Sequence, residues 1–278
     1  MIERFPVIRR ARDFHLYDER GTRYLDFYQA GGRALLSHRP PGLGRAIKDA
    51  LSRGLYAAYP SREAGRLEAL LSTLFPSHPE VRLYASYERA LAAVGGSVAD
   101  PALGGLATTK DGSAIGERVP QAVLYRPFIT DGRASDARPE REYPFLLPIL
   151  PFPAAFAPQP VCAVDAEALR GLGDADEISP VALSGSLQAA HLLAGPRPEK
   201  ATVDPTASFD ERELALWRRR GRYVELLCPQ ERFEEVFALF LERGILINPV
   251  YPGPSILPGW CSAGEFENFV KVSRMADT

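Results

Sequence analysis

The alternation of hydrophobic and polar positions predicts a mixed α/β chain. Residues 14–28, FHLYDERGTRYLDFY, alternate apolar and polar side chains on both sides of the turn residues Asp18–Gly21, which is the pattern of a β-hairpin. Residues 43–54 and 61–75 instead repeat apolar side chains at helical spacing, and Ser61 stands where an N-cap is expected. The first quarter of the chain therefore predicts a hairpin followed by two helices.

The centre of the chain is less regular. Short apolar runs at 81–84, 122–127 and 144–152 are typical of buried strands, and the prolines of the last run exclude a long central strand. Residues 85–94, ASYERALAAV, predict a strand end that runs into a helix capped by Ser86. Two further helices are expected at 164–173 and 179–195. The Pro-rich stretch 196–208, PRPEKATVDPTAS, is the best candidate for a domain boundary.

The last quarter predicts a compact α/β layer. A capping-box pattern at Ser208–Glu211 predicts a helix over 210–220, DERELALWRRR. A strand, a helix that stops at Gly244 and a second strand should follow. A second capping box at Ser262–Glu265 precedes a final helix. This order of elements is typical of a sheet covered by helices.

Composition removes several classes of function. Lys and Arg number 33 against 35 Asp and Glu, a formal net charge of -2, so nucleic acid is not an expected partner. We find neither a signal-peptide core nor an apolar run that could span a membrane. The three cysteines lie far apart without a CxxC spacing, and the four histidines are scattered, so we expect free thiols and no metal site. The chain is expected in the cytoplasm.

Three stretches carry a resemblance to a known family. Residues 16–51 contain the hairpin core DERGTRYLDF, a Gly/Pro loop around His38 and a helix; residues 81–94 form a strand–turn–helix; residues 243–270 end in a loop and a helix. In this order they resemble the class III aminotransferases. These are fold-type-I pyridoxal-phosphate enzymes that include glutamate-1-semialdehyde aminomutase.

The resemblance implies an architecture. Residues 1–75 and 206–278 should join into a small α/β domain, and residues 76–205 should form a sheet-based large domain. This centre is far shorter than in the family, so the large domain is reduced. The family also implies a dimer, with the cofactor site near its interface.

The same resemblance implies a cofactor site with three requirements: a Schiff-base lysine, an acidic residue on the pyridinium nitrogen, and small donor-rich residues around the phosphate. At the phosphate turn, Ser86 and Arg89 are the candidate anion-binding residues. Tyr87, however, adds bulk, and Glu88 adds a like charge that disfavours phosphate by about 1 kcal/mol or more. An ordinary helix start, capped by Ser86, explains the same residues.

The other two requirements have poor candidates. The apolar strand at 145–153 has no acidic residue, and the only substitute, Asp165, is placed as an N-cap. Lys200 alone has roughly the right order for the Schiff-base lysine, but it lies in the Pro-rich connector without flanking glycines, as a solvated loop lysine would. The remaining lysines fit a turn or solvent-facing helix positions: Lys48, Lys110 and Lys271.

Two functions follow, and both stay open. The first is a degenerate member of the family, without transaminase activity and without cofactor or metal, acting as a binding or interaction protein. It would be a homodimer or the partner of an aminotransferase-like protein. The alternative is an active pyridoxal-phosphate-dependent aminotransferase or aminomutase with an atypical lysine, or an enzyme of reassigned chemistry. An anion- or nucleotide-binding module at the Ser86 turn would rest on Arg89 alone.

Overall fold

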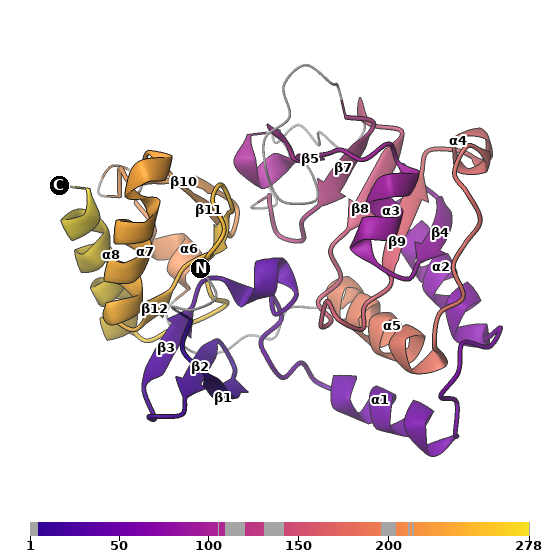
Figure 1. Ribbon diagram of the computed structural model, residues 1–278, viewed down its shortest axis with the longest axis horizontal. Coiled ribbons are helices and arrows are strands. Elements are labelled where there is room, and N and C mark those ends of the chain that lie inside the picture. Colours follow the sequence, from indigo (N-terminus) through magenta and orange to yellow (C-terminus); the bar gives the residue numbers. More distant parts are fainter. Residues whose placement is uncertain are drawn as a thin grey trace. The chain divides into compact units, whose positions relative to one another are not determined.

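The chain divides into two compact units. The computed structural model describes residues 5–104, 106–108, 120–130, 142–195, 204–210, 212 and 214–277. Unit 1 comprises Met1–Arg39, Phe128–Arg133 and Pro198–Thr278, and unit 2 comprises Pro40–Pro127 and Ala134–Arg197. In Figure 1 the indigo strands of the N-terminal segment and the orange-to-yellow C-terminal elements belong to unit 1.

Both ends of the chain share one sheet in unit 1. The predicted hairpin forms as an antiparallel pair, and the parallel pairing of Leu25 with Ile245 adds a strand from the C-terminal segment. The strand order is β1-β2-β3-β12. The strands are β1 (Ile8–Arg12), β2 (His15–Asp18), β3 (Arg23–Asp26) and β12 (Ile245–Leu246).

The second sheet of unit 1 corrects one prediction. Residues 217–220, expected at the end of a helix, form a strand because Trp217 is buried and its neighbours pair with the next strand, Arg218 facing Glu225. The sheet has the order β10-β11-β13. Its strands are β10 (Trp217–Arg220), β11 (Tyr223–Leu226) and β13 (Ser255–Ile256), and the helices of unit 1 are α6 (Pro205–Ser208), α7 (Phe233–Glu242) and α8 (Ala263–Ala276), with the 3-10 turns η2 (Gln29–Gly32) and η5 (Gln230–Arg232).

Aromatic side chains fill the core of unit 1. Phe27, from the N-terminal segment, stacks on Phe269 of α8 with ring centroids 4.6 Å apart. Trp217 and Phe240 lie against the same Phe269 ring. The small domain is therefore built from both chain ends around one core, as the resemblance implied.

Unit 2 contains a six-stranded sheet of order β4-β9-β8-β7-β5-β6. Strands β5, β7 and β8 are parallel, and β9 is antiparallel to both of its neighbours, β4 and β8. The carboxyl ends of β4, β5, β7 and β8 therefore lie at one edge. The strands are β4 (Glu80–Tyr84), β5 (Val98–Asp100), β6 (Leu106–Thr108), β7 (Ala122–Tyr125), β8 (Phe145–Pro148) and β9 (Gln159–Ala163), and the 3-10 turn η3 (Pro101–Leu103) follows β5.

Helices pack on this sheet, and their contacts with it place the start of unit 2 at Pro40. Leu67 and Leu71 of α2 pack with Leu183 of α5 against the strands, and α3 packs in a separate cluster with β4 and β9. Residues 40–75 thus belong to unit 2, whereas the boundary drawn from the sequence joined them to the N-terminal segment. The helices are α1 (Leu43–Ser52), α2 (Arg62–Leu74), α3 (Tyr87–Ala93), α4 (Ala166–Arg170) and α5 (Pro180–Ala194).

Candidate functional site

The carboxyl edge of the six-stranded sheet is the candidate functional site. Ligands of open α/β sheets bind outside the carboxyl ends of the strands. Here the turn 85–89 follows β4, Asp100 ends β5, Arg126 follows β7, and Ile149 follows β8. Three of these four positions carry polar groups, and each group has a partner within unit 2.

The turn after β4 holds both residues that the sequence singled out. Ser86 is the N-cap of α3, and its hydroxyl accepts the Arg89 N–H at 3.3 Å. The Arg89 guanidinium forks onto Asp176, with Nη2 2.7 Å from Oδ1 and Nε 3.2 Å from Oδ2. The Ala85 N–H donates to the same carboxylate at 2.9 Å. A role for Ser86 and Arg89 in cofactor binding stays a prediction.

Charge and hydrogen bonding shift both members of this pair. The Arg89 guanidinium and the Ala85 N–H outweigh partial burial and lower the pKa of the Asp176 carboxyl. The hydrogen bond and charge of Asp176 raise the pKa of Arg89. Both groups are therefore ionised around neutral pH, and each neutralises the other.

A second ion pair, at the ends of β5 and β7, is separated from β4 by β9 and β8 and is buried. Arg126 Nε is 2.7 Å from Asp100 Oδ1, and Nη2 is 2.6 Å from Oδ2. Asp100 Oδ1 also accepts the Ala102 N–H at 3.0 Å. The side chains of Arg126 and Asp100 are only 8% and 4% exposed. A bidentate pair of this kind satisfies both charges without a ligand.

The residues that follow β8 at the carboxyl edge are apolar and buried. Ile149, Leu150 and Phe152 are all buried. Phe152 lies so close to Gly185 of α5 that a Cβ on this glycine would be 2.4 Å from the ring. Asp165, the only substitute for an acidic residue in this region, caps α4 through the Ala168 N–H. It follows the antiparallel β9 and therefore lies at the opposite edge of the sheet.

The lysines fall into two groups. Lys48 and Lys271 are exposed on α1 and α8, which matches their expected solvent-facing positions. Lys110 and the candidate Schiff-base residue Lys200 lie outside the described residues. Within the described ranges, no lysine approaches the carboxyl edge from a buried position.

Sequence reasoning missed Asp100, Arg126 and Asp176. Asp100 precedes Pro101 and Ala102, as the N-cap of a helical turn would, and Arg126 directly follows an apolar strand. A charged residue at the end of each strand was therefore the sequence signal for these two positions. The pairing of strands, which makes the two charges neighbours, could not be read from spacing.

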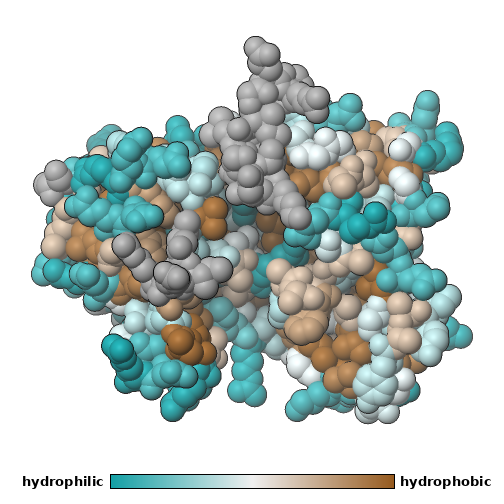
Figure 2. All heavy atoms as spheres, in the orientation of Figure 1, coloured by the Kyte–Doolittle hydropathy of each residue, from teal (hydrophilic) through white to brown (hydrophobic). Residues whose placement is uncertain are grey.

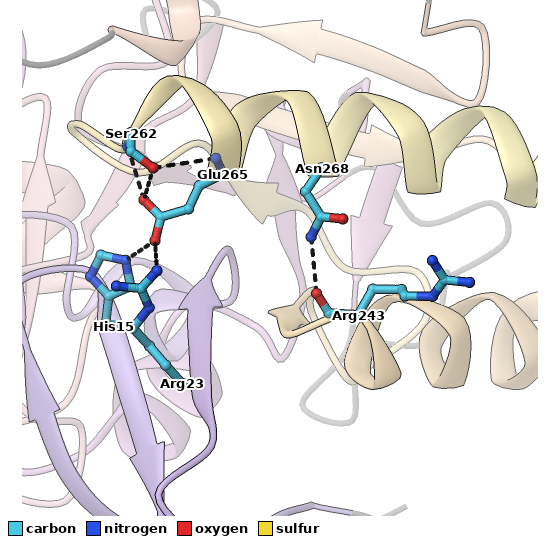
Figure 3. A network of polar contacts seen from close by, with 6 residues as sticks. All are labelled: His15, Arg23, Arg243, Ser262, Glu265 and Asn268. Carbon is cyan, nitrogen blue, oxygen red and sulfur yellow. Dashed lines mark hydrogen bonds and ion pairs between the residues drawn. The ribbon is translucent and has the colours of Figure 1, made fainter.

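Unit 1 contains a separate polar network around Glu265 (Figure 3). Glu265 Oε1 lies 2.8 Å from His15 Nε2 and 2.9 Å from Arg23 Nη2. A cleft of about 120 Å³ adjoins it. The Arg243 side chain points away from Glu265, along α8. Arg23 and Arg243 both line the cleft, and Arg23 is already paired with Glu265.

Two features are absent from the part of the chain that the structure describes. There, no group of three or more His, Cys, Asp or Glu side chains is arranged to hold a metal ion. Within the same ranges, no helix is both long and apolar enough to cross a bilayer.

Comparison with known proteins finds relatives over most of the chain and a partial match to an aminomutase. No protein-family model matches it. An uncharacterized protein of Borreliella burgdorferi is 30% identical over 272 residues, covering 98% of this chain and 91% of the relative, and an uncharacterized protein of Treponema pallidum is 28% identical over 298 residues. Glutamate-1-semialdehyde 2,1-aminomutase of Bordetella avium is 37% identical over 79 residues, or 28% of this chain and 18% of the relative.

Solved structures extend the match to the whole chain. Ornithine delta-aminotransferase of Plasmodium falciparum aligns with a TM-score of 0.69 at 14% identity, covering 98% of this chain and 94% of the other. An omega-transaminase of Sphaerobacter thermophilus aligns with a TM-score of 0.60 at 17% identity, covering 98% and 90%. This chain has the fold of these aminotransferases, the fold type I of pyridoxal-phosphate proteins. The fold class predicted for this aminotransferase-like chain is thereby confirmed.

Proposed function

We propose that this aminotransferase-like protein has lost transaminase chemistry and acts as a binding or interaction protein. The observation that carries the proposal is the carboxyl edge of the unit 2 sheet. Its polar groups form the two ion pairs Asp100–Arg126 and Asp176–Arg89, and buried apolar side chains follow β8. A site prepared for an external cofactor would instead keep donors and acceptors available to it.

The described residues do not fit pyridoxal phosphate. The donors of the turn after β4 already hold the Asp176 carboxylate, which repels a second anion. The acidic group at the same edge, Asp100, is paired through both oxygens with Arg126 and its side chain is only 4% exposed, so its charge is neutralised within the protein and is not presented to a pyridinium nitrogen. No step of transamination is therefore derived for this chain.

The absorbance spectrum of the purified protein tests the proposal. The protein is mixed with pyridoxal phosphate, reduced with borohydride, dialysed and mapped by mass spectrometry. We expect no stoichiometric adduct and no retained aldimine absorbance. A one-to-one adduct on Lys200 or Lys110, lost in Lys200→Ala or Lys110→Ala but kept in Lys48→Ala, would establish the active-enzyme alternative. An amino-donor screen would then identify the reaction.

Self-association is the second part of the proposal, and exposed apolar residues on unit 2 support it. Tyr56 is 73% and Tyr59 56% exposed, and Phe156 is 67% exposed in the loop that packs on α1 through Phe152 and Ala157. Leu51, at the end of α1, is also exposed, and Figure 2 shows apolar residues at the surface over this helix. Clustered exposed apolar residues are typical of protein interfaces.

Sedimentation tests the interaction. We expect a homodimer at micromolar concentration that dissociates when Tyr56→Ser and Tyr59→Ser are combined. The matched control Tyr17→Ser changes an aromatic residue of unit 1. If the wild-type protein sediments as a monomer, the homodimer is excluded and an aminotransferase-like partner becomes the object of the search. We place the protein in the cytoplasm, where its three buried cysteines would stay reduced.

A further inference from the structure

The outer strand of the four-stranded sheet in unit 1 has an open edge. The sheet order is β1-β2-β3-β12, and among the strands that the structure describes β1 pairs with β2 alone (Figure 1). A strand in this position presents backbone N–H and C=O groups with which a further strand can pair. The side chains of β1 decide which polypeptide can complete the sheet.

The side chains of β1 sort onto two faces. Ile8 and Ala11 pack against the core of unit 1, so the opposite face carries the polar residues. Arg10 lies on that face directly across from Tyr17, and Arg12, two positions further along, shares the face. The core contacts therefore fix which side chains a partner strand would meet.

The polar face is positively charged. The strand has the sequence IRRAR, with three arginines and no acidic residue. The Arg10 guanidinium is held over the Tyr17 ring, 4.7 Å from its centroid. The side chain of Arg12 is 72% exposed and lies 3.8 Å from the Asp13 carboxylate, a surface contact that contributes little. The open edge is thus lined by cations that solvent reaches.

These charges select the occupant. In a pair of β1 strands from two copies of the chain, arginines would face arginines, and like charges directly opposite each other destabilise a sheet. A register irregularity between Ile8 and Arg10 also twists the edge away from self-pairing. A strand with acidic side chains at alternate positions would instead place its carboxylates beside Arg10 and Arg12 while its backbone pairs with the edge.

We propose that β1 is the docking edge for an extended acidic segment of a partner protein, which adds to the sheet as a further strand. The backbone of the segment supplies the pairing, and its alternating Asp or Glu side chains supply the selection. The inference rests on the proposed function in taking the protein to act through partners, and it names the chemistry of one. The regular pairing spans only Arg10–Arg12, and these arginines are exposed, so binding is weak, reversible and screened by salt.

Binding of a synthetic peptide tests the proposal. The probe is a fluorescein-labelled decapeptide in which Glu and Thr alternate, and fluorescence anisotropy reports its binding to the full chain. We expect saturable binding, slower amide hydrogen exchange in residues 7–13, and loss of both at high salt. The matched peptide with Gln in place of Glu should bind about tenfold more weakly. A peptide in which Glu alternates with Pro keeps the charge but cannot pair as a strand, and should lose binding to the same extent.

Variants of the protein locate the site. Arg10→Gln combined with Arg12→Gln should weaken peptide binding by about tenfold, the loss expected for two partly exposed ion pairs. The control combines Arg45→Gln with Arg66→Gln, which removes two exposed charges from unit 2 and should leave binding unchanged. If the β1 double variant does not fold, Arg12→Gln alone takes its place, because Arg10 then keeps its position on Tyr17, and binding should weaken by about threefold.

The proposal is overturned if the Glu/Thr peptide does not bind, if the Glu/Pro peptide binds equally well, or if the β1 variant binds as the wild type does. A peptide that copies residues 6–13 of this chain should not bind. If that peptide binds and the Glu/Thr peptide does not, the edge belongs to a second copy of the chain. A pyridoxal-phosphate adduct in the wild-type protein would refute the proposed function and leave the peptide result unchanged, so the two failures are distinguishable.

Discussion

His15 and Glu265, 250 positions apart in the chain, meet in unit 1 with Nε2 and Oε1 separated by 2.8 Å. The other carboxylate oxygen closes the capping box of α8 by accepting the N–H and the hydroxyl of Ser262, at 2.9 and 2.8 Å. Arg23 of β3 contacts the same side chain. One carboxylate therefore joins the N-terminal hairpin to the last helix.

The stability of unit 1 should depend on the ionisation of Glu265. Burial raises the pKa of this carboxyl, but hydrogen bonds from Ser262 and His15 outweigh it, so the pKa lies below its ordinary value. A group with a lowered pKa stabilises the fold above its unfolded value of about 4.3, and this contribution is lost as pH falls through the folded value. Stability should therefore decline below about pH 5.

Glu265→Gln tests this dependence. It should lower the free energy of unfolding by about 1–2 kcal/mol at pH 7 and flatten the loss of stability on acidification. Urea unfolding at a series of pH values measures both effects. Glu267→Gln, an exposed substitution on the same helix, should retain the wild-type profile. If the free energy of unfolding varied with pH in the same way in both variants, the contacts of Glu265 with the N-terminal hairpin would not contribute to stability.

Local signals made the capping box and the hairpin predictable. The Ser262–Glu265 cap and the pairing of β2 with β3 depend on residues close together in the sequence. The Asp100–Arg126 pair could not be predicted, because the order of strands in the sheet brings together residues 26 positions apart. The strand at 217–220 escaped prediction for a related reason. Its Trp217 donates to Ser273 of α8, 56 positions away, and this burial overrides the local helical pattern.

Phe269 should be the largest single contributor to the core of unit 1. It is fully buried, and its ring meets Phe27, Trp217 and Phe240 from three other segments. Phe269→Ala should cost about 3–5 kcal/mol, because it removes apolar contacts and leaves a cavity. Chemical denaturation measures the loss. Phe156→Ala, at a 67% exposed position, is the matched control and should change stability little, whereas equal losses would contradict this account of the core.

Gly185 should tolerate no side chain while Phe152 keeps its position. An alanine there would place Cβ 2.4 Å from two ring carbons, so Gly185→Ala should cost about 1–3 kcal/mol through overpacking. The control is Gly65→Ala in α2, where nothing lies within 4 Å of the added atom. That change should stabilise by up to about 1 kcal/mol through helix propensity. Adding Phe152→Leu to Gly185→Ala should recover part of the loss, and thermal melts of the variants measure each of these changes.

Removing one member of the Asp100–Arg126 pair should lower the free energy of unfolding far more than removing both charges. Arg126→Met leaves a buried carboxylate that has lost its guanidinium partner and keeps the Ala102 N–H, and should cost about 3–5 kcal/mol. Adding Asp100→Asn removes the charge and keeps the acceptor for Ala102, so the double variant should recover most of this loss.

The pH dependence of this loss separates charge burial from ordinary packing. An uncompensated buried carboxylate has a raised pKa, so the penalty of Arg126→Met should shrink as pH falls and the group takes up a proton. Arg218→Met, at the exposed Arg218–Glu225 pair, should cost less than about 1 kcal/mol. If the penalty of Arg126→Met does not change between pH 7 and pH 4, and the double variant is no more stable than the single, the pair is a packing feature. The apolar residues after β8 alone would then explain why the carboxyl edge of the sheet presents no available polar groups.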